Sequence, residues 1–469
     1  MSLAQRCRAS DIDRVAVIGA GPSGLAAAKY LLAEKTFSTV DVFEQHSTVG
    51  GVWAYTPHAE DRGWWVSPVY DLLETNITHT LMKYTDLDFP ADSALFPRHE
   101  VVKRYLDAYA EPLGKLVHLS TQVVSVQKVA RAGRDVWEVQ TCRSGSDALS
   151  TAYYDAVVIA NGHYSEAFTP CIPGLDAFIK AHPGRVSHSK QYRRPGQFAG
   201  KKVVVVGNSA SGADISAQIS TTAKLPILIS EKDRRSEPAP AAPCWAKPMP
   251  QIVEFIPDRR CVRFANGEIE TDIDAVVFCT GYVYSFPFLK GLGSAAVVSD
   301  GGACVHGLYQ HVFSIDDPTL AFLGIPQRVV PFPFAEGQAA WISRVWAGRL
   351  GLPPTSEMRA WETALLLAKG SAAALHSMGP LQDVDYINDM HRLSLEADRD
   401  AALENGGVGK MPPFWGDEKR WLRAQMPLAK AASRKLGGER HKLRDLAALG
   451  FVYPEQSTGS PQAEHVLVK

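Results

Sequence analysis

A short glycine-rich segment near the N-terminus carries the clearest chemistry in this sequence. Gly19–Gly24 reads Gly-Ala-Gly-Pro-Ser-Gly; it follows an apolar run at 14–18 and precedes an Ala- and Leu-rich run at 25–32. This order predicts a strand, a tight turn and a helix whose N-terminal N–H groups and positive dipole end bind a pyrophosphate. Glu44 stands 20 residues after Gly24, where a carboxylate accepts the hydroxyls of an adenosine ribose. Because an acid there repels a 2′-phosphate, this first site favours FAD or NAD over NADP.

Each residue type in this loop has a physical reason to be there. Gly19 permits the tight turn, Gly21 lets the backbone approach the phosphates, and Gly24 allows the helix to pack closely against the strand. We therefore expect the loop and the following strand to bind the first dinucleotide through Gly19, Gly21, Pro22, Ser23, Gly24 and Glu44.

A second glycine-rich segment repeats the pattern. Gly207–Gly212 reads Gly-Asn-Ser-Ala-Ser-Gly, with Ser209 in place of the middle glycine. The strand that follows ends in the charged turn 230–235, where Lys232, Arg234 and Arg235 can pair with a 2′-phosphate and so select NADP. Two acids in the same turn, Glu231 and Asp233, dilute this positive charge. We take the first site to hold FAD and the second to deliver hydride from NADPH.

The elements that must position these loops follow the same order twice. Two segments share one pattern: Asp155–Gly162 reads Asp-Ala-Val-Val-Ile-Ala-Asn-Gly, and Asp274–Gly281 reads Asp-Ala-Val-Val-Phe-Cys-Thr-Gly. Strands that alternate with helices predict an α/β protein with two doubly wound, Rossmann-like dinucleotide-binding domains. We expect an FAD domain at 1–165, an NADP domain at 166–282, and the rest of the FAD domain with a helical C-terminal region at 283–469.

Local patterns add detail to this plan. Asn266–Gly267 predicts a hairpin turn, and the prolines in 236–250 predict a loop. Apolar periodicity predicts helices at 339–350, 356–367 and 417–435.

The ordered set of motifs resembles the class B flavin-dependent monooxygenases, specifically the flavin-containing monooxygenases, over about residues 11 to 345. The matching segments are Gly19–Gly24, Phe43–Glu44, Val49–Trp53, Glu74–Asn76, Phe96–Arg98, His188–Tyr192, Gly207–Gly212 and Phe278–Tyr282. In the family's identifying sequence, Phe-x-Gly-x-x-x-His-x-x-x-Tyr/Phe, Gly184, His188 and Tyr192 match, and His182 replaces the opening Phe. Baeyer–Villiger relatives usually have Trp at the last position, so Tyr192 favours oxygenation of a heteroatom.

This resemblance implies a reaction and a set of site residues. NADPH would reduce FAD, O2 would form a flavin C4a-hydroperoxide, and one oxygen atom would pass to the nitrogen or sulfur of a small organic molecule. Asn76 is the candidate catalytic residue, because an amide beside the flavin both donates and accepts hydrogen bonds and can steady the oxygenated cofactor. The remaining residues expected to contact FAD or NADP are Gly51, Val52, Trp53, Arg98, Gly207, Asn208, Ser209, Ser211, Gly212, Thr280 and Gly281.

Three alternatives stay open. A Baeyer–Villiger monooxygenase would use the same cofactors on a ketone. A pyridine-nucleotide disulfide reductase shares both glycine loops but needs a redox Cys pair after the first, and no Cys stands between Cys7 and Cys142. A flavin-binding module without enzymatic activity is the third.

Composition excludes other classes. The chain has 46% hydrophobic and 21% charged residues and a net charge of −1, which argues against disorder and against binding to nucleic acid. Seven scattered Cys without a Cys-x-x-Cys pair favour reduced thiols and no metal site. No apolar run spans a bilayer and no leader is recognisable, so we expect a soluble, cytoplasmic enzyme whose partners are O2 and a small substrate. Homo-oligomerisation stays open.

Overall fold

The computed structural model describes residues 12–57, 66–232, 243–292 and 298–454. Its largest sheet has seven strands in the order β20-β21-β22-β7-β1-β2-β3, and the four-strand centre β22-β7-β1-β2 is parallel. The strands of this sheet are β1 Arg14–Ile18, β2 Thr39–Phe43, β3 Val117–His118, β7 Ala156–Ile159, β20 Leu308–Tyr309, β21 Phe313–Ser314 and β22 Leu320–Phe322. The chain thus leaves this sheet after β7 and returns to it more than a hundred residues later.

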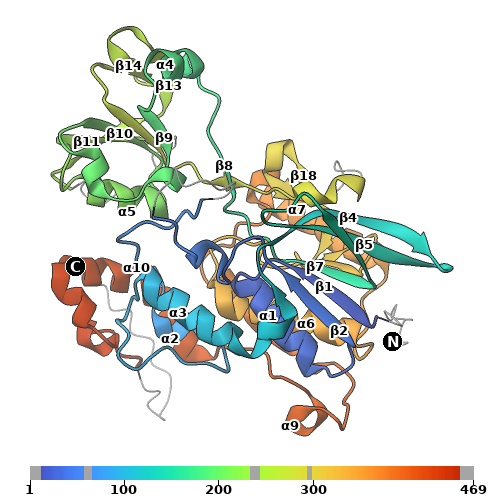
Figure 1. The fold of residues 1–469 in the computed structure, drawn as a ribbon. Helices are drawn as coiled ribbons and strands as arrows, with labels where there is room; N and C mark the ends of the chain where they lie inside the picture. The colour runs from blue at the N-terminus through green and yellow to red at the C-terminus, as the bar shows by residue number, and fades with distance from the viewer. Residues whose placement is uncertain (1–11, 58–65, 233–242, 293–297, 455–469) are drawn as a thin grey trace.

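Both faces of this sheet are covered, as a parallel sheet requires. Val15 and Val17 of β1 pack into a core with three helices, whereas the alternate residues Ala16 and Ile18 pack into a second core with a three-stranded antiparallel sheet. The covering helices are α1 Pro22–Ala33, α3 His99–Ala110 and α6 Pro331–Trp346. The covering strands are β4 Thr121–Arg131, β5 Arg134–Arg143 and β6 Leu149–Tyr154. Figure 1 shows the helices and β4–β5 on opposite sides of β1 and β2.

The second large sheet is parallel throughout, in the order β12-β11-β10-β16-β9. Its strands are β9 Val186–His188, β10 Lys202–Val206, β11 Lys224–Glu231, β12 Ala246–Pro250 and β16 Ala275–Phe278. Helix α5, Ala210–Ile219, covers one face, and helix α4, Leu175–Ala181, with β13 Ile252–Ile256, covers the other. Two large sheets with parallel centres, each packed against helices, therefore make this an α/β fold of the predicted class. The domain bounds at 165 and 282 stay a prediction.

The smaller strands join these layers. They are β8 Glu166–Ala167, β14 Cys261–Phe264, β15 Ile269–Glu270, β17 Tyr282–Val283, β18 Val298–Ser299 and β19 Cys304–Val305. Strands β14 and β15 pair antiparallel across Asn266–Gly267, so the predicted hairpin is present. Strand β8 pairs with β17 where the chain passes between the two large sheets (Figure 1).

The C-terminal third is helical, as predicted. Its helices are α7 Thr355–Lys369, α8 Gln382–Leu395, α9 Glu404–Gly407 and α10 Asp417–Lys435; the short α2, His79–Met82, lies near α10. Helix α10 has the bounds that the periodicity predicts, and α8 was not predicted. Helix α6 begins at Pro331, earlier than the predicted residue 339. Prolines are tolerated in the first turn of a helix, because the backbone N–H groups there have no acceptor within the helix and nothing is lost when a proline lacks one.

The predicted loop at 236–250 is wrong at its C-terminal end. Residues 246–250 form β12, although Pro248 and Pro250 lie within it. Strand β12 is the edge of its sheet, where a residue without an N–H is tolerated on the unpaired side. Residues 233–242 lie outside the described residues.

Candidate active site

One cavity of 660 Å³ lies between the two glycine loops and receives residues from both large sheets. From the first half it is lined by Gly19, Gly21, Pro22, Ser23, Glu44, Gly51, Val52, Trp53 and Asn76. From the second half it is lined by residues of α5, namely Ala210, Ser211, Asp214 and Ile215. The tertiary structure therefore brings half of the predicted site residues to a single space, nearly all of them from the first half of the chain.

The first glycine of each loop makes the same turn. Gly19 has φ +104° and Gly207 has φ +97°, values that residues with a side chain rarely adopt. A Cβ on Gly19 would lie 2.6 Å from the carbonyl oxygen of Ala160, and one on Gly207 would lie 2.7 Å from that of Cys279. Both glycines therefore pack against the end of the neighbouring strand.

The last glycine of each loop lets its helix approach that turn. A Cβ on Gly24 would lie 1.8 Å from the Gly19 carbonyl oxygen, and a Cβ on Gly212 would lie 2.0 Å from the Gly207 carbonyl oxygen. Gly24 and Gly212 are buried and shape the loops without lining the cavity. The first and last glycines thus make equivalent close contacts in the two loops.

The loops fit phosphate groups. Helix α1 begins after Gly21 and α5 begins after Ser209, and within the described chain neither residue caps its helix with a side-chain hydrogen bond. The first N–H groups of both helices are consequently open to an anion. A Cβ on Gly51 would lie 3.0 Å from the Gly21 Cα, so the two glycines form a cradle that any side chain would fill. These features can hold a dinucleotide in each half.

Glu44 lies beside the first loop. One of its carboxylate oxygens accepts the N–H of Ala20 at 2.9 Å, and the other accepts the N–H of His46 at 2.9 Å. Its side chain is buried yet lines the cavity. The carboxylate is therefore held beside the first glycine loop, at the wall of the cavity.

The second half has an acid at the matching position. The N–H of Gly19 donates to the carbonyl of Phe43, and the N–H of Gly207 donates to that of Ser230, both at 2.8 Å. The residues that follow are Glu44 and Glu231, and Glu231 accepts a hydrogen bond from the side chain of Asn208 at 2.8 Å. The predicted base Lys232 comes next and is exposed, whereas Arg234 lies outside the described residues.

Other predicted residues also lie outside the cavity lining, namely Gly207, Asn208 and Ser209 of the second loop, and Arg98, Thr280 and Gly281. Arg98 donates to the carbonyl of Asp71 at 2.7 Å and pairs with Glu100 at 3.0 Å. Thr280 and Gly281 hold the connection between the sheets, because the Thr280 hydroxyl donates to the carbonyl of Phe168 and the Gly281 carbonyl accepts the Phe168 N–H. Their predicted contacts with cofactor stay a prediction that these bonds do not support.

His188 also lies outside the cavity lining. It ends β9 as a buried residue, and its Nδ1 accepts the N–H of Lys190 at 3.1 Å, which caps the short helix Ser189–Gln191. Burial lowers its pKa to about 4. The neutral ring therefore acts as a structural cap at the end of β9.

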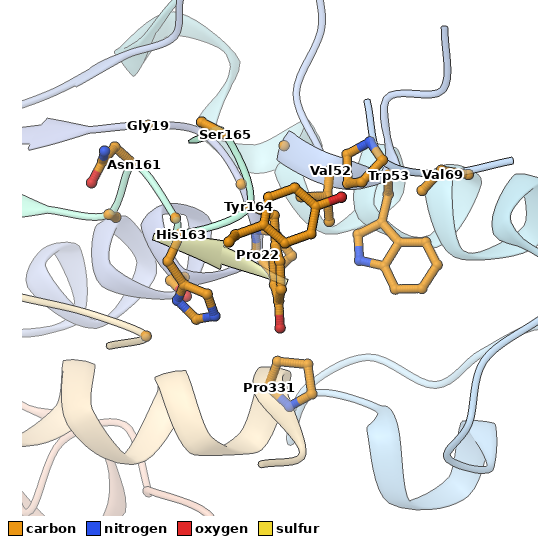
Figure 2. A pocket seen from close by; sticks show the side chains of 18 of the residues that line it. Gly19, Pro22, Val52, Trp53, Val69, Asn161, His163, Tyr164, Ser165 and Pro331 are labelled. Atoms are coloured by element: carbon orange, nitrogen blue, oxygen red, sulfur yellow. The ribbon is translucent and has the colours of Figure 1, made fainter. Parts of the chain in front are cut away.

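The cavity contains residues that the sequence did not single out. His163 and Tyr164 follow β7 and Asn161–Gly162, and their rings lie 4.4 Å apart between centroids. Burial lowers the pKa of His163 to about 4, so its imidazole is neutral near pH 7. Figure 2 shows Trp53, His163 and Tyr164 projecting towards the space above the start of α6 at Pro331. Their position after the Asp-Ala-Val-Val strand was the available signal, since ligands bind beyond the carboxyl ends of parallel strands.

Two glycine loops of the dinucleotide-binding type at one cavity are typical of flavoproteins that use a nicotinamide nucleotide. Comparison with known proteins agrees with this class. The model of the family described as "FMO-like: Flavin-binding monooxygenase-like" matches residues 12–235 and 247–403. Flavin-containing monooxygenase FMO GS-OX5 of Arabidopsis thaliana is 36% identical over 411 residues, which cover 82% of this chain and 85% of the relative.

Solved structures give the same answer. S-allyl-L-cysteine S-oxygenase from Allium sativum matches with a TM-score of 0.75 and 30% identity, covering 93% of this chain and 96% of that chain. Tmm from Pelagibacter sp. strain HTCC7211 matches with a TM-score of 0.71 and 22% identity, covering 90% and 91%, and shows the fold alone. The chain therefore belongs to the flavin-binding monooxygenase-like family.

Membership has direct consequences. The protein is a flavin-dependent monooxygenase, and the family implies a flavin, NADPH, O2 and a small-molecule substrate. Among the described residues, no helix is long and apolar enough to cross a membrane. In that same part of the chain, no three His, Cys, Asp or Glu side chains gather as a potential metal site.

Proposed function

We propose that this protein is an FAD- and NADPH-dependent oxygenase that transfers one oxygen atom from O2 to the sulfur of a small thioether, with amine nitrogen as the alternative acceptor. One oxygen atom of O2 enters the product, the other leaves as water, and NADPH supplies the two electrons. The observation that supports the proposal is the shared cavity, which is lined by the first glycine loop, by Asn76, and by Ala210 and Ser211 at the start of α5.

The residues of the chain have separate tasks in this reaction. The α1 loop, Gly51 and Glu44 would hold FAD, and the α5 loop with Asn208 would hold NADP(H). Bound FAD would supply the redox chemistry that activates oxygen. Asn76 is exposed within the cavity, where its amide can hydrogen-bond to that oxygen and slow its loss as peroxide.

The choice of sulfur rests on similarity. The solved relative with 30% identity is an S-oxygenase, and Tyr192 stands where Baeyer–Villiger enzymes usually have Trp. The described residues place no cysteine on the cavity wall, which argues against a disulfide reductase that uses its own thiols. Trp53, Tyr164, Phe332 and Phe334 give the cavity an aromatic wall that suits an apolar substituent on the substrate.

A labelling experiment tests the proposal. The purified yellow protein is given NADPH and ¹⁸O2 with matched thioether, tertiary amine and ketone substrates, and the products are identified by mass spectrometry. We expect a sulfoxide that contains one labelled oxygen and NADPH consumption that matches product. Preferred conversion of the ketone to an ester would instead establish the Baeyer–Villiger alternative. Colourless protein, or protein that never consumes NADPH, would refute oxygenase activity altogether.

A further inference from the structure

Helix α10 carries a buried lysine. Its buried face is formed by Met426, Ala429, Lys430 and Ser433, at the three- and four-residue spacing of one helix stripe. Lys430 is only 7% exposed, and an ammonium group with so little water needs partners. Those partners lie on the segment that carries Asn76.

Lys430 binds the residues just before Asn76. Its Nζ donates to the backbone carbonyl of Thr75 at 2.8 Å and to the carboxylate of Glu74 at 3.2 Å. Arg440, just beyond α10, donates to the same carboxylate at 2.9 Å. Burial raises the pKa of Glu74, but Arg440 and Lys430 outweigh burial, so the pKa lies below its usual value. The bond to Thr75 fixes the peptide group that leads directly into Asn76.

One turn further along, α10 contacts the other half of the site. The guanidinium of Arg434 donates to the carboxylate of Asp214 on α5 at 2.8 Å. The second oxygen of that carboxylate accepts the hydroxyl of Tyr70, and both Asp214 and Tyr70 line the cavity. Figure 1 shows α10 beneath α5 and close to α2, between the two halves of the molecule.

We propose that α10 is a clamp that sets the position of Asn76 relative to helix α5, which follows the proposed NADP-binding loop, with Lys430 and Arg434 as positioning residues. The proposal rests on the proposed function for its catalytic meaning. Lys430 holds the segment that carries Asn76, and Arg434 holds helix α5. Because the two residues lie one helical turn apart, the same helix anchors both sides of the cavity, each through its own contact.

Two substitutions separate the two contacts. Lys430→Met removes the ammonium group at similar length and leaves Glu74 paired with Arg440. Arg434→Gln removes a half-exposed charge, and Arg434→Lys is its conservative counterpart. Arg420→Gln is the matched control, because Arg420 lies on the same helix and pairs with Asp385, outside the cavity.

The readouts are hydrogen exchange of residues 74–77 in the holoenzyme, the dissociation constant of NADP⁺, and the peroxide released per NADPH. For Lys430→Met we expect exchange at 74–77 to rise about tenfold, more peroxide, and unchanged NADP⁺ affinity. For Arg434→Gln we expect NADP⁺ to bind about fivefold more weakly, with exchange at 74–77 unchanged. Arg434→Lys should retain affinity, and Arg420→Gln should match the wild type in all three.

Several outcomes overturn the clamp. Unchanged exchange at 74–77 in Lys430→Met would do so, as would equal effects of both variants on every readout, which general destabilisation produces. If Lys430→Met does not fold, Lys430→Gln, a shorter and polar replacement at the same position, also removes the ammonium group from Thr75 and should raise exchange at 74–77 in the same way. An inactive wild type would refute the proposed function, whereas the exchange measurement would still decide whether α10 restrains the Asn76 segment.

Discussion

The amide of Asn208 donates a hydrogen bond of 2.8 Å to the carboxylate of Glu231. Glu231 follows Ser230 in the second half just as Glu44 follows Phe43 in the first, since the two preceding carbonyls accept equivalent N–H groups. In the first half this acid suits a ribose without a 2′-phosphate. In the second half it places a negative charge where NADPH would carry its 2′-phosphate.

Replacement of Glu231 should therefore strengthen the preference for NADPH. For Glu231→Gln we expect the KM for NADPH to fall roughly fivefold, because removing an exposed repulsion is worth about 1 kcal/mol, while the KM for NADH stays equal or rises. Steady-state rates with both nucleotides measure the ratio. Glu254→Gln, an exposed carboxylate on β13, is the control and should leave that ratio unchanged. An unaltered ratio in Glu231→Gln would show that this acid does not face the nucleotide.

Loss of the Asn76 amide should uncouple the enzyme. In Asn76→Ala we expect NADPH reduction of the flavin to continue, whereas the oxygenated flavin decays at least about tenfold faster, since one lost donor at a developing charge costs this much or more. Rapid mixing of reduced enzyme with O2 measures the decay, and a peroxide assay measures its product. Asn266→Ala, in the remote β14–β15 hairpin, should behave as wild type. Equal decay in both variants would remove Asn76 from the reaction.

Glu336 on α6 should make the stability depend on pH. It is fully buried and accepts hydrogen bonds from the N–H and hydroxyl of Thr85, and burial raises its pKa from 4.5 to about 7. Because the folded pKa is the higher one, its protonated form stabilises the fold at low pH, and this contribution is lost as pH rises from 4.5 to about 7.

Glu336→Gln should remove this dependence. The free energy of unfolding of the variant minus that of the wild type should be about 3 kcal/mol larger at about pH 8 than at about pH 4, because only the wild type loses the contribution of Glu336. Urea unfolding at both pH values measures the difference. Parallel pH profiles for variant and wild type would show that Glu336 titrates as it does in the unfolded chain.

Substitution of Gly24 or Gly212 should impair one proposed cofactor site and leave the other intact. A methyl group on Gly24 or Gly212 must displace the backbone of its loop, at a cost of about 3 kcal/mol. We expect Gly24→Ala to lose bound flavin, and Gly212→Ala to retain flavin but bind NADP⁺ weakly. Flavin absorbance and NADP⁺ titration distinguish them. Gly114→Ala, where a Cβ would meet no atom within 4 Å, is the control. Normal flavin content in Gly24→Ala would contradict the packing described above.

The spacing of residues close together in the chain determined much of this protein. A strand, a glycine turn and a helix are neighbours in sequence, so the loops at 19–24 and 207–212 could be predicted with the roles of their glycines. The alternation of strands and helices likewise predicted two parallel sheets, and the apolar periodicity predicted α10 to the residue.

Only the tertiary structure decided which distant residues share the cavity. It brings His163 and Tyr164 to the wall, turns Arg98 towards Asp71, and lets β12 contain prolines because that strand lies at an edge. It also brings Lys430 to Thr75, 355 residues away in the chain. Such contacts depend on how whole layers pack, and local spacing carries no information about that packing.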